Sequence, residues 1–127
     1  MIRVRALDHI VLCVRDVAAT RRFYEQLLGM ESREERPGKW SLHFGVQKIS
    51  LQDFVHAPAI ARETVPGSGN FCLLTDEPIE DVVAMLAQAG LRILDGPAER
   101  AGASGPILSV YFHDPDGNLV EVSRPIS

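Results

Sequence analysis

The sequence predicts an α+β fold in which a single domain, residues 1–127, contains two βαβββ modules at about residues 5–55 and 69–125. Short runs rich in Val, Ile and Leu alternate with two amphipathic helical segments, and the same order of elements occurs twice. A module of this kind leaves one face of its sheet bare. We therefore expect the two modules to form a curved eight-stranded surface with a central cleft, where the functional site should lie.

The first module begins with "LDHIVLCV" (7–14), a short run rich in branched aliphatic residues that is typical of a buried strand. Asp16 is the expected N-cap of a helix, because apolar residues at helical spacing follow it as far as Gly29. Three strands separated by short turns are then expected, namely "MESREE" (30–35), "KWSLHFG" (39–45) and "KISLQDF" (48–54).

The second module follows an Ala-, Pro- and Gly-rich segment, residues 56–69, that we interpret as a linker. "NFCLLTD" (70–76) predicts a strand, and Pro78 begins a helix that Gly90 ends. The last three predicted strands are "LRILDG" (91–96), "ILSVYFHD" (107–114) and "NLVEVSRP" (118–125), with the "DPDGN" turn before the final one.

The repeat identifies positions that correspond between the modules. An offset of 61 residues places His9 on Asn70, at the start of the first strand of each module. Keeping the alternation of the last strands pairs Ser50 with Glu121. Residues two apart share a strand face, so Gln52 points where Ser50 points.

Glu121 lies between two valines in an apolar strand, and this placement has two interpretations. If its face of the strand is turned inward, the carboxylate needs a hydrogen-bond partner, an ion pair or a metal ion. If the opposite face is inward, Glu121 is simply exposed, since one face of an antiparallel sheet can be solvated.

Composition excludes several classes of function. The chain has 13 Lys and Arg against 17 Asp and Glu, for a net charge of -4, and no basic cluster that would favour nucleic acid. No apolar run is long enough for a membrane helix, and the first residues lack the apolar core of a signal peptide. Cys13 and Cys72 both lie in apolar runs, so we expect buried thiols in a cytoplasmic protein.

Two long motifs carry a resemblance to a known family. "LDHIVLCVRDVAATRRFYEQLLGM" and "VYFHDPDGNLVEVS", together with the paired modules, resemble the vicinal oxygen chelate superfamily of glyoxalases, bleomycin-resistance proteins, fosfomycin-resistance enzymes and extradiol dioxygenases. "FGVQKISLQD" and "PGSGNFCLLT" are similar to its glyoxalase domain-containing and virulence-associated subfamily. The resemblance implies a βαβββ repeat and a divalent metal site in the cleft.

The superfamily takes metal ligands from the first and last strands of each module, which are the positions of His9, Ser50, Asn70 and Glu121 here. His9 and Glu121 match the usual ligand types, whereas Ser50 replaces a glutamate. In the closer subfamily a histidine matches Gln52 and an acidic residue matches Asn70. The candidate ligands are thus His9, Glu121, Gln52 and Asn70, for Mg²⁺, Mn²⁺, Ni²⁺ or Zn²⁺.

Three functions remain open. The first is a metal-dependent lyase or isomerase whose ion chelates adjacent oxygens of a small substrate. The second is a metal-free binding protein like the bleomycin-resistance branch, and the third is a scaffold with a vestigial site. A dioxygenase is disfavoured, because one histidine and one carboxylate do not complete the set of two histidines and one carboxylate.

The expected partner is a small molecule, with neither nucleic acid nor membrane involved, and we expect a homodimer whose cleft is completed within one chain or between two. Pocket residues are expected at four positions, namely Ser50, His43, Arg100 and Tyr111. Arg100 is interpreted as an anion-binding arginine in a Gly- and Ala-rich loop. His43 and Tyr111 also have an ordinary structural interpretation as strand residues.

Overall fold

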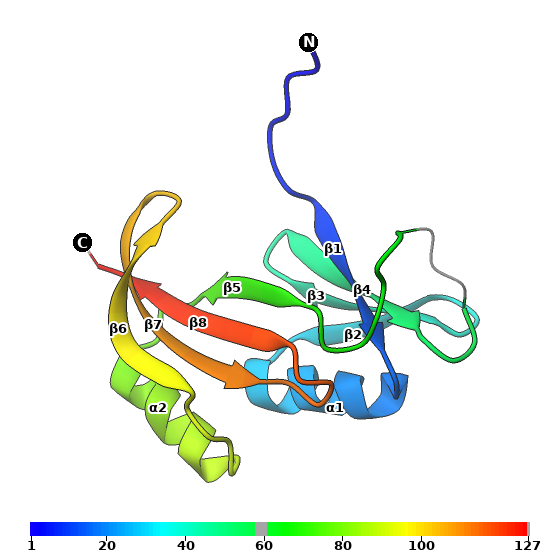
Figure 1. Ribbon diagram of the computed structural model, residues 1–127. Helices are drawn as coiled ribbons and strands as arrows, with labels where there is room; N and C mark the ends of the chain where they lie inside the picture. Colours follow the sequence, from blue (N-terminus) through cyan, green and yellow to red (C-terminus); the bar gives the residue numbers. More distant parts are fainter. Residues whose placement is uncertain (58–60, 127) are drawn as a thin grey trace. The chain divides into compact units, whose positions relative to one another are not determined.

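The computed structural model describes residues 1–57 and 61–126, which form two compact units, Met1–Pro66 and Gly67–Ser127 (Figure 1). Each unit contains one helix and four strands in the predicted order, so the βαβββ repeat is confirmed. Of the predicted linker 56–69, residues 58–60 lie outside the described part of the chain. The single curved sheet of eight strands stays a prediction, because each unit has its own four-stranded sheet.

The first unit contains sheet 1, in which the strand order is β1-β4-β3-β2. Its elements are β1 (His9–Val14), α1 (Val17–Leu28), β2 (Glu31–Arg36), β3 (Lys39–Phe44) and β4 (Gln47–Asp53). β1 pairs with β4 in parallel, and the other pairs are antiparallel. The parallel pair brings the first and last strands of the module together, as the candidate site requires.

The ends of α1 follow the sequence signals. The side chain of Asp16 accepts a hydrogen bond from the backbone N–H of Ala19 at 2.9 Å. Gly29 ends the helix in the left-handed conformation with φ of 65°, which glycine adopts without steric cost.

Asp16→Ala is expected to lower the free energy of unfolding by about 1 kcal/mol, because it removes this acceptor at the N-cap. Asp16→Asn keeps an acceptor, so it should lower the free energy of unfolding by only about a few tenths of 1 kcal/mol. Urea denaturation of the three proteins measures the difference. An equal loss in both variants would show that the cap does not stabilise α1.

The second unit contains sheet 2, in which the strand order is β5-β8-β7-β6. Its elements are β5 (Asn70–Leu74), α2 (Ile79–Gln88), β6 (Asp95–Gly102), β7 (Gly105–His113) and β8 (Leu119–Pro125). β5 pairs with β8 in parallel, and β7 pairs antiparallel with both β6 and β8. The first and last strands of this module are therefore neighbours as well.

Strand alternation gives each sheet an apolar face and an opposite face. In sheet 1 the buried apolar side chains are Leu12, Val14, Leu42, Ile49 and Leu51, and α1 packs over β2, β3 and β4. In sheet 2 they are Val110, Phe112, Val120 and Val122, and α2 packs on β7. The opposite faces, which we call the polar faces, carry the candidate site residues.

The prediction of a strand at 91–96 is wrong, because the strand is β6, Asp95–Gly102. The predicted strand ended at Gly96, whereas Gly96 and Pro97 lie at a register shift on an edge strand, where such residues are tolerated. A side chain on Gly96 would overlap the carbonyl oxygen of Ser109, which explains the glycine. Most of β6 is exposed, so it forms through pairing with β7 and lacks an apolar pattern.

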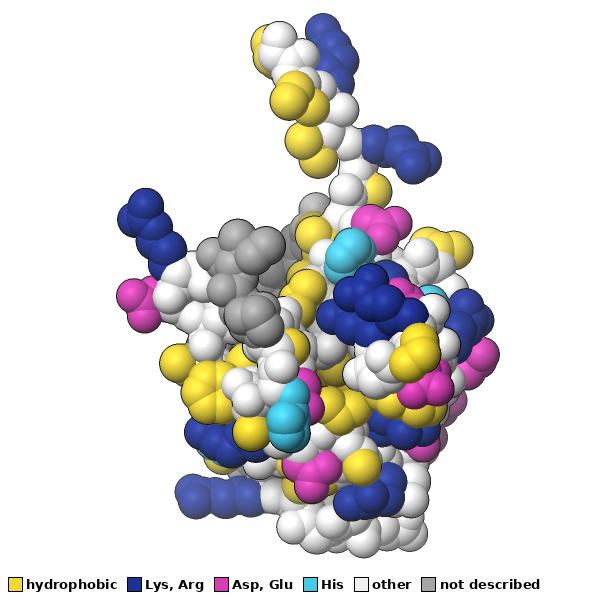
Figure 2. Space-filling view, turned by 90° about the vertical axis from the view of Figure 1, so that its right-hand side faces the viewer, with side chains coloured by type: hydrophobic (Ala, Val, Ile, Leu, Met, Phe, Trp, Pro, Cys, Tyr) yellow, Lys and Arg dark blue, Asp and Glu magenta, His cyan; other side chains and the backbone are white. Residues whose placement is uncertain are grey.

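Charged side chains of both signs are interspersed on the face shown in Figure 2, with no extended basic patch there. Among the helices of the described residues, none has the length and hydropathy to cross a membrane.

Candidate functional site

The strand register places the four candidate positions at equivalent points of the two units. In sheet 1, Ser50 pairs with Val11, two residues after His9. In sheet 2, Glu121 pairs with Cys72, two residues after Asn70. Each unit thus has the same diagonal pair on its polar face, and the sequence-based correspondence of Ser50 with Glu121 agrees with this register.

His9 begins β1 and has an ordered partner. Its Nδ1 lies 2.9 Å from Oδ2 of Asp8, and the side chain is 42% exposed. A carboxylate at one ring nitrogen favours the tautomer with hydrogen on Nδ1, which leaves the lone pair of Nε2 directed outward. Asp8 was not among the predicted residues, although a carboxylate next to a candidate histidine is a visible signal.

Ser50 and Gln52 share the polar face of β4, as expected from their spacing. Ser50 is only 5% exposed. Gln52 pairs with Cys13, four residues along β1 from His9, or about 13 Å at the usual rise of a strand. Its amide nitrogen donates to the carbonyl of Ala57 at 3.2 Å. Ser50 therefore lies nearer to His9 than Gln52 does.

Glu121 lies on the polar face of β8 and is half-buried, so the inward interpretation fits this carboxylate better than full exposure. The hydroxyl of Ser123 donates to its Oε2 at 3.3 Å. Burial and a hydrogen bond to Glu121 raise the pKa of Tyr111. Because Tyr111 and Ser123 both donate hydrogen bonds to the carboxylate, these two residues restrict its orientation.

Cys72 is exposed, so the prediction that both thiols are buried is wrong for Cys72 and confirmed for Cys13. The two cysteines lie in runs of the same apolar character, so the sequence does not distinguish the buried thiol from the exposed one, and Cys72 is the register partner of Glu121. Burial of the sulfur raises the pKa of the thiol, and the Glu121 carboxylate raises it further, against a hydrogen bond with Ser123. The thiol is therefore a poor nucleophile.

Asn70 begins β5, and the chain before it is fixed to the turn between β7 and β8. The backbone N–H of Gly69 donates to Oδ1 of Asn118 at 2.7 Å, and the carbonyl of Gly69 accepts from the N–H of Leu119 at 2.9 Å. The side chain of Asn118 is bound in turn to Asp114. This turn positions Asn70.

Arg100 belongs to strand β6, so its prediction as a loop residue is wrong. One of its terminal nitrogens donates to Asp95 at 2.9 Å. Its guanidinium carbon lies 5.7 Å from the centre of the Tyr111 ring. Arg100, Tyr111 and Glu121 consequently form a connected polar row on sheet 2.

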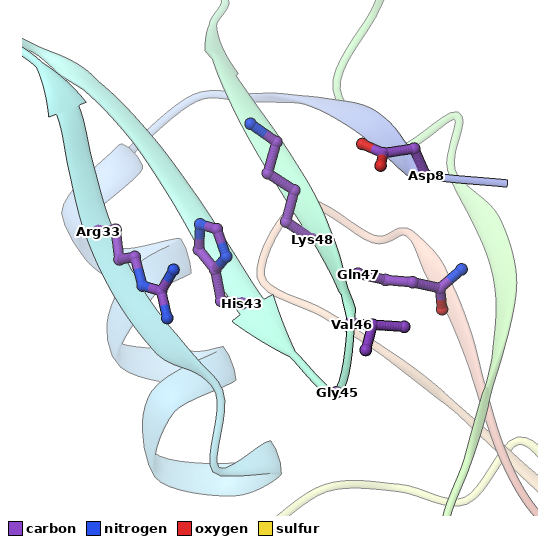
Figure 3. Close-up of a pocket in the computed structure, with 7 residues that line it drawn as sticks. All are labelled: Asp8, Arg33, His43, Gly45, Val46, Gln47 and Lys48. Carbon is purple, nitrogen blue, oxygen red and sulfur yellow. The ribbon is translucent and has the colours of Figure 1, made fainter.

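His43 lines a cavity of about 360 Å³ in the first unit, on the polar face of sheet 1. Arg33, Lys48 and Asp8 also line the cavity, together with the turn at 45–47 (Figure 3). Arg33 and Lys48 were not predicted, because charged side chains in these two strands are equally typical of a solvated strand face.

Neither unit contains, in its described residues, a group of three or more His, Cys, Asp or Glu side chains that could hold a metal ion. The available donors are the imidazole of His9, the carboxylate of Glu121 and the neutral oxygens of Ser50 and Asn70. Imidazole and carboxylate suit Mn²⁺, Ni²⁺ or Zn²⁺, whereas hydroxyl and amide oxygens are weaker ligands. Within each unit, one strong donor, His9 or Glu121, therefore stands beside a neutral oxygen donor, which is fewer strong ligands than a divalent ion usually has.

Two curated relatives cover most of the chain. Virulence protein STM3117 of Salmonella typhimurium is 47% identical over 120 residues, which is 93% of this chain and 83% of the relative. Glyoxalase domain-containing protein RDO1 of Mycosarcoma maydis is 40% identical over 121 residues, which is 94% of this chain and 68% of the relative.

Two solved structures are similar to this chain over almost its whole length. The crystal structure of STM3117 has a TM-score of 0.93 and 42% identity, covering 98% of this chain and all of that one. The integron cassette protein VPC_CASS1 from V. Pseudocholerae has a TM-score of 0.95 and 40% identity, covering 100% and 99% of the chains. The model of the family described as "Glyoxalase/Bleomycin resistance protein/Dioxygenase superfamily" matches residues 6–122. The chain belongs to this superfamily.

Proposed function

We propose that the chain is a metal-assisted lyase or isomerase that acts on a small molecule with adjacent oxygen atoms. His9 and Glu121 are the strong ligands of one divalent ion, with Asn70 and Gln52 as assisting donors. The two strong ligands come from the two units of one chain or of two copies in a homodimer. The observation that carries the proposal is that both residues have ordered partners suited to ligands.

The environment of His9 supports its role as a ligand. Metal-bound histidines usually donate their second ring N–H to a carboxylate or a carbonyl, which fixes the tautomer and raises basicity. The contact between Nδ1 of His9 and Asp8 has this form. Asp8 would hold the ring while Nε2 binds the ion.

The environment of Glu121 supports its role as the second ligand. Ser123 and Tyr111 hold the carboxylate, and a half-buried charge is better stabilised by an ion than left with two neutral donors. A bound divalent ion would supply Lewis-acid stabilisation of negative charge that develops on a substrate oxygen. Tyr111 and Ser123 would orient Glu121, and Asn70 would offer its amide oxygen.

Metal analysis of the purified protein tests this function. After treatment with a chelator, the protein should take up about one equivalent of Mn²⁺, Ni²⁺ or Zn²⁺ on dialysis. Its thermal midpoint should rise, since a ligand at 100 times its dissociation constant stabilises by about 2.7 kcal/mol. Absence of both uptake and midpoint shift with all three ions would contradict the proposal.

A second candidate is a metal-free binding protein, and the neutral side chains of Ser50 and Asn70 at two ligand positions favour it. In that case the two polar faces bind a small molecule through hydrogen bonds alone. The expected result is a ligand whose affinity is the same with and without a chelator. Ligand binding that requires the divalent ion would eliminate this candidate.

A further inference from the structure

The cavity on sheet 1 combines cationic groups from three adjacent strands. Arg33 comes from β2, His43 from β3 and Lys48 from β4, and all three side chains project on the side of the sheet away from α1 (Figure 3). The volume of about 360 Å³ lies in the range of small-molecule sites. The question is which of these groups are available to a ligand.

Arg33 offers the most available donors. Only its Nε is bound, to Glu31 at 2.9 Å, and its Nη1 and Nη2 groups donate to no protein acceptor within residues 1–57 and 61–126. The pair with Glu31 is exposed, at 54% and 68% for the two side chains, and such pairs contribute little, about 0–1 kcal/mol. The terminal nitrogens can therefore bind a planar or tetrahedral anion through two hydrogen bonds.

His43 adds a second group on the neighbouring strand. The hydroxyl of Ser41 donates to Glu35 at 2.6 Å, so Nε2 of His43 must donate to the same hydroxyl oxygen, 2.9 Å away. In the neutral ring Nδ1 then carries a lone pair. This lone pair can accept a hydrogen bond from a hydroxyl group of the ligand, beside the anionic group that binds to Arg33.

The carboxylates near the cavity already have partners, including its cationic side chains: Glu31 binds Arg33, and Glu35 also lies 3.6 Å from Nε2 of His43. Glu35 binds Lys48 at 2.7 Å, and hydrogen bonds from Lys48 and Ser41 lower the pKa of Glu35 to about 2. Asp8 is the carboxylate that lines the cavity, and it binds His9. The terminal nitrogens of Arg33 hence remain the donors that a ligand anion can bind, because Lys48 is already paired with Glu35.

We propose that this cavity binds the anionic group, a carboxylate or a phosphate, of the small molecule on which the protein acts. Lys48 is the register partner of His9, so a ligand in the cavity adjoins the candidate metal ligand. The inference rests on the proposed function and narrows its substrate class to small anionic oxygen compounds. Arg33 is the residue that selects this charge.

Anion titrations monitored by NMR test the proposal on chelator-treated protein. The probes are inorganic phosphate and acetate, with chloride added to keep the ionic strength constant. Amide signals of β2 and β3 around Arg33 and His43 should shift with at least one probe, and the probe that binds more tightly identifies the kind of group.

Arg33→Gln should weaken binding of the preferred probe about tenfold, because a charged bidentate donor is lost. Arg36→Gln is the matched control, since Arg36 lies on the same strand and does not line the cavity. Equal affinities in the two variants, or shifts no larger than those with chloride, would overturn the proposal. These titrations contain no divalent ion, so their failure is distinct from a failure of metal binding.

Discussion

Replacing Glu121 by glutamine is expected to weaken binding of the divalent ion by at least about 100-fold, because the site loses its one charged ligand. Glutamine keeps the shape of the side chain, and its amide oxygen still accepts a hydrogen bond from Ser123 or Tyr111. The fold should therefore survive, and the change in metal affinity reports the charge. Isothermal titration with Mn²⁺ or Zn²⁺ measures it.

The matched control is Glu99→Gln, an exposed glutamate on β6 of the same unit. His9→Ala should have an effect of the same order as Glu121→Gln, while His113→Ala, at the exposed end of β7, should have none. If Glu121→Gln and Glu99→Gln bind the ion alike, Glu121 is not a ligand. Urea denaturation of each variant is the folding control. A midpoint close to that of the unsubstituted protein shows that the variant is folded and that only metal binding is lost.

The repeat made most of the fold predictable from the sequence. Two helices were predicted from spacing and caps, and Asp16, Gly29 and Pro78 lie at or beside their ends as expected. Six strands follow runs that alternate or are rich in aliphatic residues, whereas β2 has neither pattern. β6 was misplaced because its pairing with β7 determines it, and backbone pairing leaves no trace in the pattern of side chains.

The candidate site was predictable only in part. Alternation correctly placed Gln52 on the same face as Ser50, and the repeat related Ser50 to Glu121. The partners that orient these residues depend on cross-strand register, as the contact between Tyr111 and Glu121 does. The cavity residues Arg33 and Lys48 likewise meet through pairing of β2, β3 and β4, which sequence spacing alone does not specify.

Asn118→Asp is expected to lower the free energy of unfolding by about 3–5 kcal/mol at neutral pH, the scale of an uncompensated buried charge. Asn118 is 1% exposed and Asp114 is 5% exposed. The amide nitrogen of Asn118 donates to Oδ2 of Asp114 at 2.8 Å. The substitution replaces this donor with an oxygen, so two buried carboxylates face each other without a hydrogen between them.

The loss should depend on pH in a defined direction. Two adjacent carboxylates raise the pKa of one of them above its ordinary value of about 4 in the folded variant. At a pH between the ordinary pKa of the unfolded chain and the raised pKa of the folded variant, the folded variant holds one more proton than the unfolded chain. The stability of the variant therefore increases as the pH falls. Urea denaturation at about pH 7 and about pH 5 should show a partial recovery relative to the unsubstituted protein.

Asn118→Ala separates the charge from the lost hydrogen bonds. It removes the bonds to Asp114 and to the N–H of Gly69 without adding a carboxylate, and should cost about 2 kcal/mol with no recovery at lower pH. The same pH response in both variants would contradict the charge argument. Gly69 directly precedes Asn70, so the turn also positions this candidate ligand on β5. If Asn118→Ala weakens metal binding more than Glu99→Gln does, the turn contributes to the site.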